Sequence, residues 1–479
     1  MTSPQISSLN VKDLSFMNHI KTMAIIGVSQ KRDFFFLRNH QENFQGDIYV
    51  IHPSLKTIPN FDDTHIYRSV IDVPKEVDFV FIAVPPREVV NVMKECAQKG
   101  VKLASIFTAE FSDAGTEEGR KLEEELLKST DDKVRFLGPN GMGLYYPKLG
   151  IAWRPHFPKI PGNIGFIAQS GGICNISIYM AQELGISFSK VFSFGNGADL
   201  DIVDLIYFLS NDDETDIILC YVEGIKENRG KDLQKVLKLN KKPIIFLKGG
   251  KTETGSIAAK THTASISGQK QIWSSLFHQY NAIEVESLEQ MLYTTKILDY
   301  YGPFLLENLA VFSISGGYGV ILVDLIVKNG MKVPPFSPEI QEKLDEKFFV
   351  LGTSSKNPLD VSAQIYRSEV MREIIDTALS DKKIDGLIMD LPSWYFNVDF
   401  HLKKDYTFEP TMIESLSLGH KHKKALFPII QRVNCPEARK RVVKKLNEKK
   451  VPVFAEPLEF ISLLPKISEY TKRMKSKRS

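Results

Sequence analysis

A histidine within a long run of small and polar residues is the first candidate for chemistry in this chain. His262 belongs to the segment 246–268, which reads FLKGGKTETGSIAAKTHTASISG. This segment has too few large apolar residues to build a core, and loops of this length in compact domains are usually functional or disordered. Lys248, Lys251 and Lys260 add positive charge to the segment that holds the imidazole. The pattern is typical of a loop that handles phosphate, and a solvated surface loop is the alternative.

A carboxylate that would orient this imidazole follows a predicted strand. Glu223 comes directly after the apolar run 217–222, in the sequence CYVEGIK. A carboxylate at the end of a strand can accept an N–H from a histidine and thereby fix its tautomer. We therefore expect Glu223 to partner His262, and the alternative is a surface glutamate that pairs with Lys226.

Two segments of the chain match each other in register without a gap. They run from Asn163 to Gly185 and from Asn308 to Gly330, and each predicts a strand, a Ser-Gly-Gly turn and a helix closed by glycine. Glycines at a helix start let backbone N–H groups face an anion, and the helix dipole adds positive potential. The predicted phosphate-binding residues are Ser170, Gly171 and Gly172 in the first copy and Ser315, Gly316 and Gly317 in the second. Duplicated scaffolds with tight turns and no ligand are the alternative.

The elements that position these residues alternate between strand-like and helix-like segments. This alternation predicts an α/β protein with parallel, doubly wound sheets, on which ligands bind at the carboxyl ends of the strands. In the first 150 residues, strands are predicted at 23–27, 48–51, 79–84, 103–107 and 134–137, with helices at 87–98 and 117–128. The first strand ends in a single glycine, Gly27, rather than in GxGxxG. A nucleotide-type ligand still fits, and a Rossmann-like domain without ligand is the alternative.

Two joints divide the 479 residues into three predicted domains. The Pro-rich segment 154–161 and the pair Gly302-Pro303 have the composition of linkers. We expect a Rossmann-like domain at 1–150, a flavodoxin-like domain with the His262 loop at 160–300, and a second flavodoxin-like domain at 303–479.

Composition excludes several classes of protein. The chain has 61 basic and 58 acidic residues, a net charge of +3, which argues against a dedicated nucleic-acid binder. The four cysteines include no CxxC pair, so we expect a reduced cytoplasmic protein without structural zinc. His420 and His422 occur in the lysine-rich sequence GHKHKK, which favours a solvated loop over a metal site. The N-terminus lacks the apolar core of a signal peptide, and no apolar run is long enough for a membrane span.

Several motifs, taken in order, resemble the alpha subunit of ADP-forming acyl-CoA synthetases, which are relatives of succinyl-CoA synthetase. They are IIGVS, VDFVFIAVPP, LGPNGMG, IAQSGG, FSFGNGADLDIVDLIYFL, YVEGIK, LKGGKTETGSIAAKTHTASISG and SISGGYG. The resemblance covers nearly the whole chain and implies an N-terminal CoA-binding domain followed by two succinyl-CoA synthetase-like domains. It also implies that CoA contacts Gly27, Ser29, Pro53, Val84, Pro85, Pro86, Thr108 and Asn140.

The resemblance implies a reversible reaction in which acyl-CoA, phosphate and ADP give a carboxylic acid, CoA and ATP. An acyl phosphate would form where the two Ser-Gly-Gly helices meet, His262 would become phosphohistidine, and Glu223 would orient the imidazole. Positioning and positive electrostatics are what phosphoryl transfer needs. The family's nucleotide site is an ATP-grasp module, for which these residues leave no room. We therefore expect ADP or ATP with Mg²⁺ on a separate beta subunit, in an alpha2-beta2 assembly.

Three positions depart from the family pattern. Residues 261–264 read THTA rather than SHTG, His52-Pro53-Ser54 replaces Asn-Pro-Lys and removes a cation near CoA, and Phe34–Phe36 intrude where a glycine is usual. Two alternatives therefore stay open. One is a non-catalytic CoA-binding paralogue, and the other is an acyl or carbamoyl transferase that works without ATP-grasp. Acetate is the family's default substrate, and no motif in the chain encodes the acid.

Overall fold

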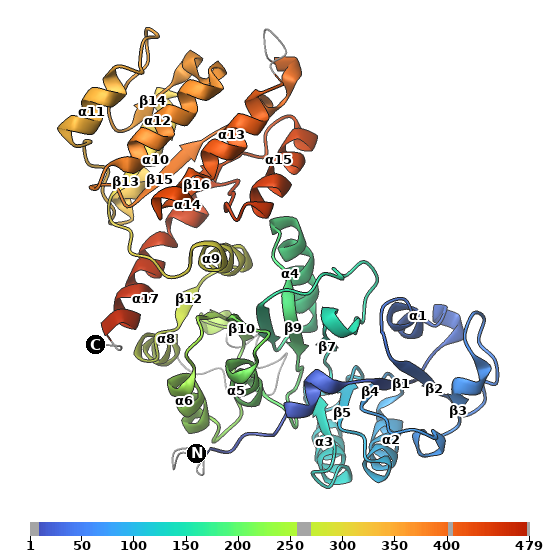
Figure 1. Cartoon of the computed structure of the whole chain (residues 1–479). Helices are drawn as coiled ribbons and strands as arrows, with labels where there is room; N and C mark the ends of the chain where they lie inside the picture. The colour runs from blue at the N-terminus through green and yellow to red at the C-terminus, as the bar shows by residue number, and fades with distance from the viewer. Residues whose placement is uncertain (1–8, 256–269, 401–405, 477–479) are drawn as a thin grey trace. The chain divides into compact units, whose positions relative to one another are not determined.

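The computed structural model describes residues 9–255, 270–400 and 406–476 (Figure 1). The chain divides into two compact units, Met1–Leu288 and Glu289–Ser479. Within the described residues, the first unit holds two sheets and the second unit holds one. His262 lies outside the described residues, so its partnership with Glu223 stays a prediction.

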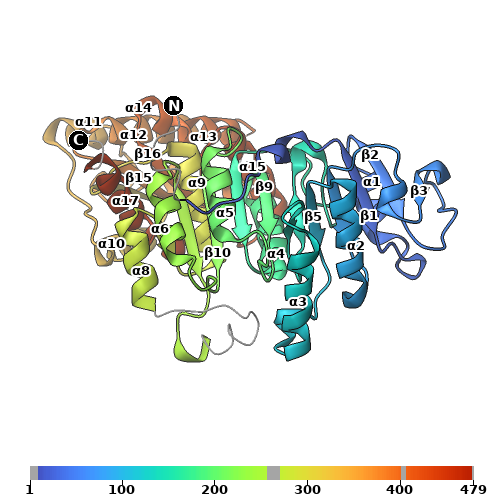
Figure 2. The ribbon, with the colours of Figure 1, turned by 90° about the horizontal axis from the view of Figure 1, so that it is seen from below.

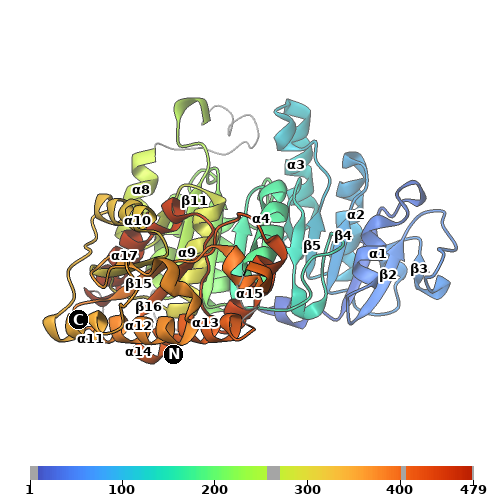
Figure 3. The same cartoon turned by 90° about the horizontal axis from the view of Figure 1, so that it is seen from above.

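The N-terminal sheet is parallel and has the strand order β3-β2-β1-β4-β5-β6. In this doubly wound order, ligands bind outside the carboxyl ends of the strands. Helix α1 lies on one side of the sheet, and α2 packs beside α3 on the other (Figures 1 and 3). The strands are β1 (Thr22–Ile26), β2 (Asp47–Ile51), β3 (Ile66–Tyr67), β4 (Phe79–Ile82), β5 (Leu103–Ile106) and β6 (Arg135–Leu137), and the helices are α1 (Phe35–Gln41), α2 (Pro86–Lys99) and α3 (Glu117–Ser129).

The second sheet has the strand order β12-β11-β10-β8-β9-β7, and β7 runs antiparallel to β9. Its parallel strands follow the flavodoxin-like order, whose switch point lies between β8 and β10. Helices α5 and α6 lie side by side over this sheet (Figure 2). The strands are β7 (Gly143–Tyr145), β8 (Ile164–Ala168), β9 (Phe188–Ser193), β10 (Ile217–Val222), β11 (Ile244–Lys248) and β12 (Ile283–Val285), and the helices are α4 (Gly171–Leu184), α5 (Ile202–Asn211), α6 (Gly230–Leu239) and α8 (Lys270–Gln279).

The second unit has one parallel sheet in the order β14-β13-β15-β16, which is again flavodoxin-like. The predicted α/β fold class is thus confirmed. The strands are β13 (Leu309–Ser313), β14 (Leu359–Asp360), β15 (Gly386–Asp390) and β16 (Ala425–Ile429). The helices are α9 (Leu288–Tyr301), α10 (Gly316–Lys328), α11 (Pro338–Asp345), α12 (Ser368–Ser380), α13 (Phe408–Leu416), α14 (Leu418–His422), α15 (Pro436–Glu448), α16 (Pro457–Ile461) and α17 (Leu464–Ser476).

Four strands are absent from the sequence prediction: β3, β7, β12 and β14. Each is an edge strand of only two or three residues. Strand β7 joins the second sheet although it precedes residue 150, where the first domain is predicted to end. The division into three domains stays a prediction.

His420 and His422 lie in the short helix α14 rather than in a loop. The Nε2 atom of His422 is 2.6 Å from Oδ1 of Asp376, whereas Nε2 of His420 is 3.1 Å from the carbonyl oxygen of Lys449. Across the described ranges, no group of three or more His, Cys, Asp or Glu side chains could hold a metal ion. A separate search of the same residues finds no helix long and apolar enough to span a membrane.

His40 makes the stability of the first unit depend on pH. It is buried in α1 and bonds to the carbonyl oxygen of Phe36 through Nδ1 at 2.7 Å. Burial lowers the pKa of His40 to about 4, against 6.5 for an unperturbed histidine. As the pH falls below about 6.5, the unfolded chain therefore takes up a proton on His40. The folded chain does not take up this proton until the pH falls to about 4. We expect the unfolding free energy to drop by about 2 kcal/mol between pH 7 and pH 5 from this group alone.

Urea unfolding of the wild type and of His40→Gln at several pH values measures this effect. The glutamine keeps an N–H donor but does not titrate, so its pH slope should be shallower. The exposed His19 provides the matched control, His19→Gln, which should retain the wild-type slope. Equal slopes for His40→Gln and the wild type would contradict the assignment.

Candidate functional site

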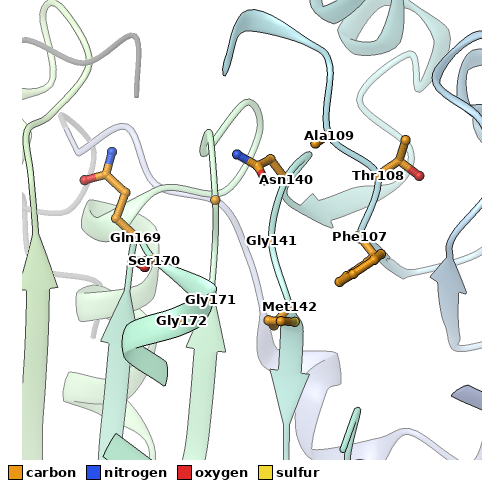
Figure 4. A pocket seen from close by; sticks show the side chains of 11 residues that line it. Phe107, Thr108, Ala109, Asn140, Gly141, Met142, Gln169, Ser170, Gly171 and Gly172 are labelled. Atoms are coloured by element: carbon orange, nitrogen blue, oxygen red, sulfur yellow. The ribbon is translucent and has the colours of Figure 1, made fainter. Parts of the chain in front are cut away.

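A cavity of about 370 Å³ lies within the first unit, which we call the first cavity (Figure 4). It opens where the carboxyl ends of β5 and β8 meet the loops that follow β6 and β9. Its lining residues are Phe107, Thr108, Ala109, Asn140, Gly141, Met142, Gln169, Ser170, Gly171, Gly172 and Gly195. The structure therefore brings two predicted CoA-binding residues, Thr108 and Asn140, together with the first predicted phosphate-binding turn.

The amino-terminal end of α4 forms one wall of the first cavity. Strand β8 is buried throughout and leads to Ser170, whose hydroxyl oxygen accepts the backbone N–H of Ile173 at 3.4 Å. A Cβ on Gly172 would meet no atom closer than 3.7 Å, so the start of the helix has open space beside it. An anion in this space would meet free backbone N–H groups and the positive end of the helix dipole.

Glycines allow the loops around the cavity to approach each other closely. Gly195 has a φ of +53°, and a Cβ on it would lie 2.3 Å from the carbonyl oxygen of Pro139. The backbone N–H of Asn140 donates to the carbonyl oxygen of Thr108 at 2.8 Å, and that of Asn196 donates to Pro139 at 3.0 Å. The loop that follows β6 is therefore fixed to both sheets of the unit.

A second cavity, of about 480 Å³, adjoins the first. Its lining residues are Gly27, Val28, Ser29, Lys31, Arg32, Phe35, Phe36, Ala83, Val84, Pro85, Phe107 and Thr108. Phe107 and Thr108 line both cavities. Gly27 has a φ of +96°, and a Cβ there would lie 2.4 Å from the carbonyl oxygen of Ala83, so this strand end requires glycine.

The two cavities account for six of the eight predicted CoA-binding residues. Gly27, Ser29, Val84 and Pro85 line the second cavity, Asn140 lines the first, and Thr108 lines both. Among the described residues, Pro53 and Pro86 line neither cavity. Pro53 follows β2, and Pro86 begins α2. All eight assignments remain predictions.

Two cations in the second cavity were missed from the sequence. Lys31 and Arg32 belong to a short 3₁₀ turn that begins directly after Ser29, so the loop after β1 supplies positive charge to this cavity. The sequence QKR, which directly follows Ser29, could have indicated these two cations. Phe35 and Phe36 are also part of the wall. The Phe36 ring lies 5.1 Å from that of Phe107 between ring centroids.

Glu223 lies at the switch point of the second sheet and is only 6% exposed. The hydroxyl of Tyr221 donates to its Oε1 at 3.0 Å, and its backbone N–H donates to Oε1 of Gln169 at 2.9 Å. The alternative of a surface glutamate paired with Lys226 is wrong, since Glu223 is buried and the Lys226 ammonium donates to the carbonyl oxygen of Ala198. Through Gln169, Glu223 is linked to the wall of the first cavity.

Lys248 holds the turn that carries Glu223. Its ammonium donates to the carbonyl oxygen of Glu223 at 2.8 Å and also to that of Gly249. Burial lowers the pKa of Lys248 to about 8, and the charge of Glu223 opposes this shift. A positive charge is thus fixed at the end of β11, beside the start of the segment that contains His262.

The second Ser-Gly-Gly turn differs from the first. A Cβ on Gly316 would lie 2.6 Å from Oδ2 of Asp360, and the Gly316 backbone N–H donates to this carboxylate. Burial raises the pKa of Asp360, while the N–H groups of Ser362 and Gly316 act in the opposite direction. The start of α10 therefore has an internal carboxylate where the start of α4 borders a cavity. Phosphate binding at Ser315, Gly316 and Gly317 stays a prediction.

Comparison with protein families matches two parts of the chain. Residues 21–147 match the model of a CoA binding domain, and residues 161–298 match that of a succinyl-CoA ligase like flavodoxin domain. These ranges contain the second cavity and the α4 wall of the first.

Curated relatives extend the similarity along the chain. The acetate–CoA ligase [ADP-forming] II of Archaeoglobus fulgidus is 30% identical over 97% of this chain and 68% of its own length. The acetate–CoA ligase [ADP-forming] II subunit alpha of Pyrococcus furiosus is 33% identical over 78% of this chain and 81% of its own length. The acetate–CoA ligase [ADP-forming] of Methanocaldococcus jannaschii is 34% identical over 73% of this chain, but the match covers only 49% of its own length. The chain thus spans about half the length of some relatives.

A solved structure shares the fold across nearly all of this chain. It is the dinucleotide forming acetyl-coenzyme A synthetase 1 of Ca. Korarchaeum cryptofilum in complex with phosphate and ADP. The TM-score is 0.80 at 28% sequence identity, and the match covers 97% of this chain and 98% of that one.

Proposed function

This chain belongs to the family of ADP-forming acetate–CoA ligases, and on that premise we propose that it binds acyl-CoA and forms the acyl phosphate of an ADP-forming acyl-CoA synthetase. The full reaction converts acyl-CoA, phosphate and ADP into a carboxylic acid, CoA and ATP, and it is reversible. One observation carries the proposal. The first cavity joins predicted CoA contacts, Thr108 and Asn140, to the predicted phosphate-binding turn of Ser170, Gly171 and Gly172.

In this proposal CoA extends through both cavities. Its phosphates lie near Lys31 and Arg32 in the second cavity, and its thioester passes Phe107 and Thr108 into the first. A phosphate held at the start of α4 attacks the thioester carbonyl. A carbon–oxygen bond forms, the carbon–sulfur bond breaks, and CoA leaves as a thiolate that takes up a proton. The helix N–H groups stabilise the charge that develops on the oxygens.

The second half-reaction moves the phosphoryl group from the acyl phosphate to His262. A nitrogen of the imidazole attacks phosphorus, and the carboxylate product leaves. Covalent catalysis of this kind divides one difficult transfer into two easier ones. Glu223 would hold the imidazole in the reactive tautomer, supported by its bonds to Tyr221 and Gln169.

The nucleotide step needs an ATP-grasp module, which we place on a beta subunit in an alpha2-beta2 assembly with ADP or ATP and Mg²⁺. The name "subunit alpha" of the Pyrococcus furiosus relative supports this arrangement. We also propose a cytoplasmic location and a small carboxylic acid as product, with acetate as the family default. The four cysteines are free, which fits a reducing compartment.

Phosphorylation of the purified chain tests the proposal. The chain is incubated with acetyl-CoA or other acyl-CoAs and radiolabelled phosphate, and the label is tested for acid lability and mapped. Acid-labile label on His262 is the expected result. Binding of CoA without any label would favour a CoA-binding paralogue, and acyl exchange without label would favour a transferase.

Removing the two cations of the second cavity should weaken CoA binding. In the variant Lys31→Ala/Arg32→Ala, we expect the Kd for CoA to rise about tenfold at low salt, because two phosphate-pairing charges are lost. The difference should shrink at high salt, since both side chains are exposed. Isothermal titration calorimetry measures both effects. Lys94→Ala on the exposed side of α2 removes a charge elsewhere and should leave Kd unchanged. A Kd equal to that of the wild type would place the CoA phosphates away from this turn.

A further inference from the structure

The side chains of the first cavity leave no charge for a substrate to meet. Among the described residues, its eleven lining residues include no ionisable side chain. Two of the polar lining side chains already form hydrogen bonds within the protein. The hydroxyl of Thr108 donates to the carbonyl oxygen of Val84 at 2.6 Å, and Oε1 of Gln169 accepts the backbone N–H of Glu223 at 2.9 Å. The phosphate would take the N–H groups at the start of α4. A second charged group, on the acyl part of the substrate, would therefore lose its hydration without meeting an oppositely charged side chain in this lining.

Two large apolar side chains give the first cavity its shape. The position of Phe107 is fixed by two other rings. Its ring centroid lies 5.1 Å from that of Phe36 and 6.3 Å from that of Phe81. Met142 is the only other large apolar residue among those described in the lining. In the view of Figure 4, Met142 lies between Gly171 and the ring of Phe107.

Met142 is placed tightly against the start of α4. Its backbone N–H donates to the hydroxyl oxygen of Ser193 at 3.0 Å, which fixes the main chain at this point. A Cβ on Gly171 would lie only 2.7 Å from Cγ of Met142. The thioether therefore occupies the space directly beside the turn at which the phosphate would sit. An acyl group whose carbonyl carbon faces that phosphate extends next to Met142.

We propose that Met142 sets the length of the acyl group that this chain accepts, and that the acyl group is uncharged. The inference rests on the proposed function, because it takes the first cavity as the place where the thioester meets phosphate. A methionine side chain is unbranched and adapts its shape, so it allows a range of short acyl chains rather than one. A second carboxylate on the acyl group, as in succinyl-CoA, would meet no counter-charge.

The test measures the apparent second-order rate constant (kcat/KM) of single-turnover phosphorylation of the full chain with acetyl-, butyryl-, hexanoyl-, phenylacetyl- and succinyl-CoA. For the wild type, we expect succinyl-CoA to be about a hundredfold poorer than the best neutral thioester. Met142→Trp should lower kcat/KM for hexanoyl-CoA about tenfold more than for acetyl-CoA. Met142→Ala should shift the preference towards the longer chains, and it keeps the inference testable if the tryptophan variant fails to fold.

Two controls separate acyl selection from other effects. The Kd for free CoA should change less than about twofold in both variants, because CoA without an acyl group does not reach Met142. Ile176→Trp places the same bulk on the exposed side of α4 and should keep the wild-type profile. Succinyl-CoA within about tenfold of the best neutral thioester, or equal losses for all acyl-CoAs in Met142→Trp, would overturn the inference alone. No label from any thioester, despite CoA binding, would overturn the proposed function and this inference with it.

Discussion

Replacement of His262 by asparagine is expected to abolish phosphorylation of the chain by acyl-CoA and phosphate. Asparagine is polar and of similar reach, but its amide nitrogen is not a nucleophile and cannot carry a phosphoryl group. Removing a covalent nucleophile commonly costs several orders of magnitude in rate, about 10⁴-fold or more. The measurement is the amount of acid-labile label after incubation with radiolabelled phosphate.

The same variant should bind CoA as the wild type does, because the described residues that line the two cavities do not include His262. Acyl phosphate should still form, and it can be trapped with hydroxylamine. His278→Asn, on an exposed part of α8, is the matched control and should be labelled normally. Full turnover in His262→Asn would disprove the phosphohistidine route.

Glu223→Gln is expected to slow two steps by about 10²- to 10³-fold each: the formation of phosphohistidine from acyl phosphate, and the transfer of its phosphoryl group to ADP. Glutamine preserves the volume of the side chain and can still accept the bond from Tyr221. It lacks the negative charge that would fix the tautomer of the imidazole and favour its nucleophilic nitrogen. Single-turnover labelling, followed by chase with ADP in the presence of the partner subunit, gives the two rates separately.

A purely structural role for Glu223 would give a different pattern. In that case the variant would unfold at lower urea concentration, and the pH dependence of labelling would stay unchanged. Loss of the carboxylate should instead alter the pH profile of labelling, and Glu223→Asp should recover part of the rate. The exposed Glu227 supplies the control Glu227→Gln, which should behave as the wild type. An unchanged labelling rate in Glu223→Gln would remove Glu223 from the mechanism.

The long buried strands were predictable because their local pattern is strong. Strands such as Ile164–Ala168 and Ile217–Val222 are apolar at nearly every position, as expected for strands covered on both faces. Short edge strands such as Ile66–Tyr67 carry too few residues for any periodic signal. The resemblance to ADP-forming acyl-CoA synthetases is confirmed by the relatives and the solved structure.

The site was predictable as residue types but not as an arrangement. Thr108 and Ser170 were predicted separately, as a CoA contact and as part of a phosphate-binding turn. Their common cavity depends on how two sheets pack, which no local pattern encodes. Lys31 and Arg32 were not predicted, because the family pattern has its cation near CoA after β2, whereas these two cations follow β1. The burial of Glu223 likewise follows from its neighbours Tyr221 and Gln169 in the fold.

The sharing of Phe107 and Thr108 by the two cavities has a thermodynamic consequence. A ligand that fills both cavities bridges the N-terminal sheet and the second sheet, so its binding free energy opposes the separation of one sheet from the other. At a concentration of one hundred times Kd, such a ligand raises the free energy of unfolding by about 2.7 kcal/mol. Phosphate alone, bound at the start of α4, would occupy part of the first cavity and would not reach the second. Acyl-CoA in both cavities would therefore hold the two sheets of the unit together, whereas phosphate would contact only the residues of the first cavity.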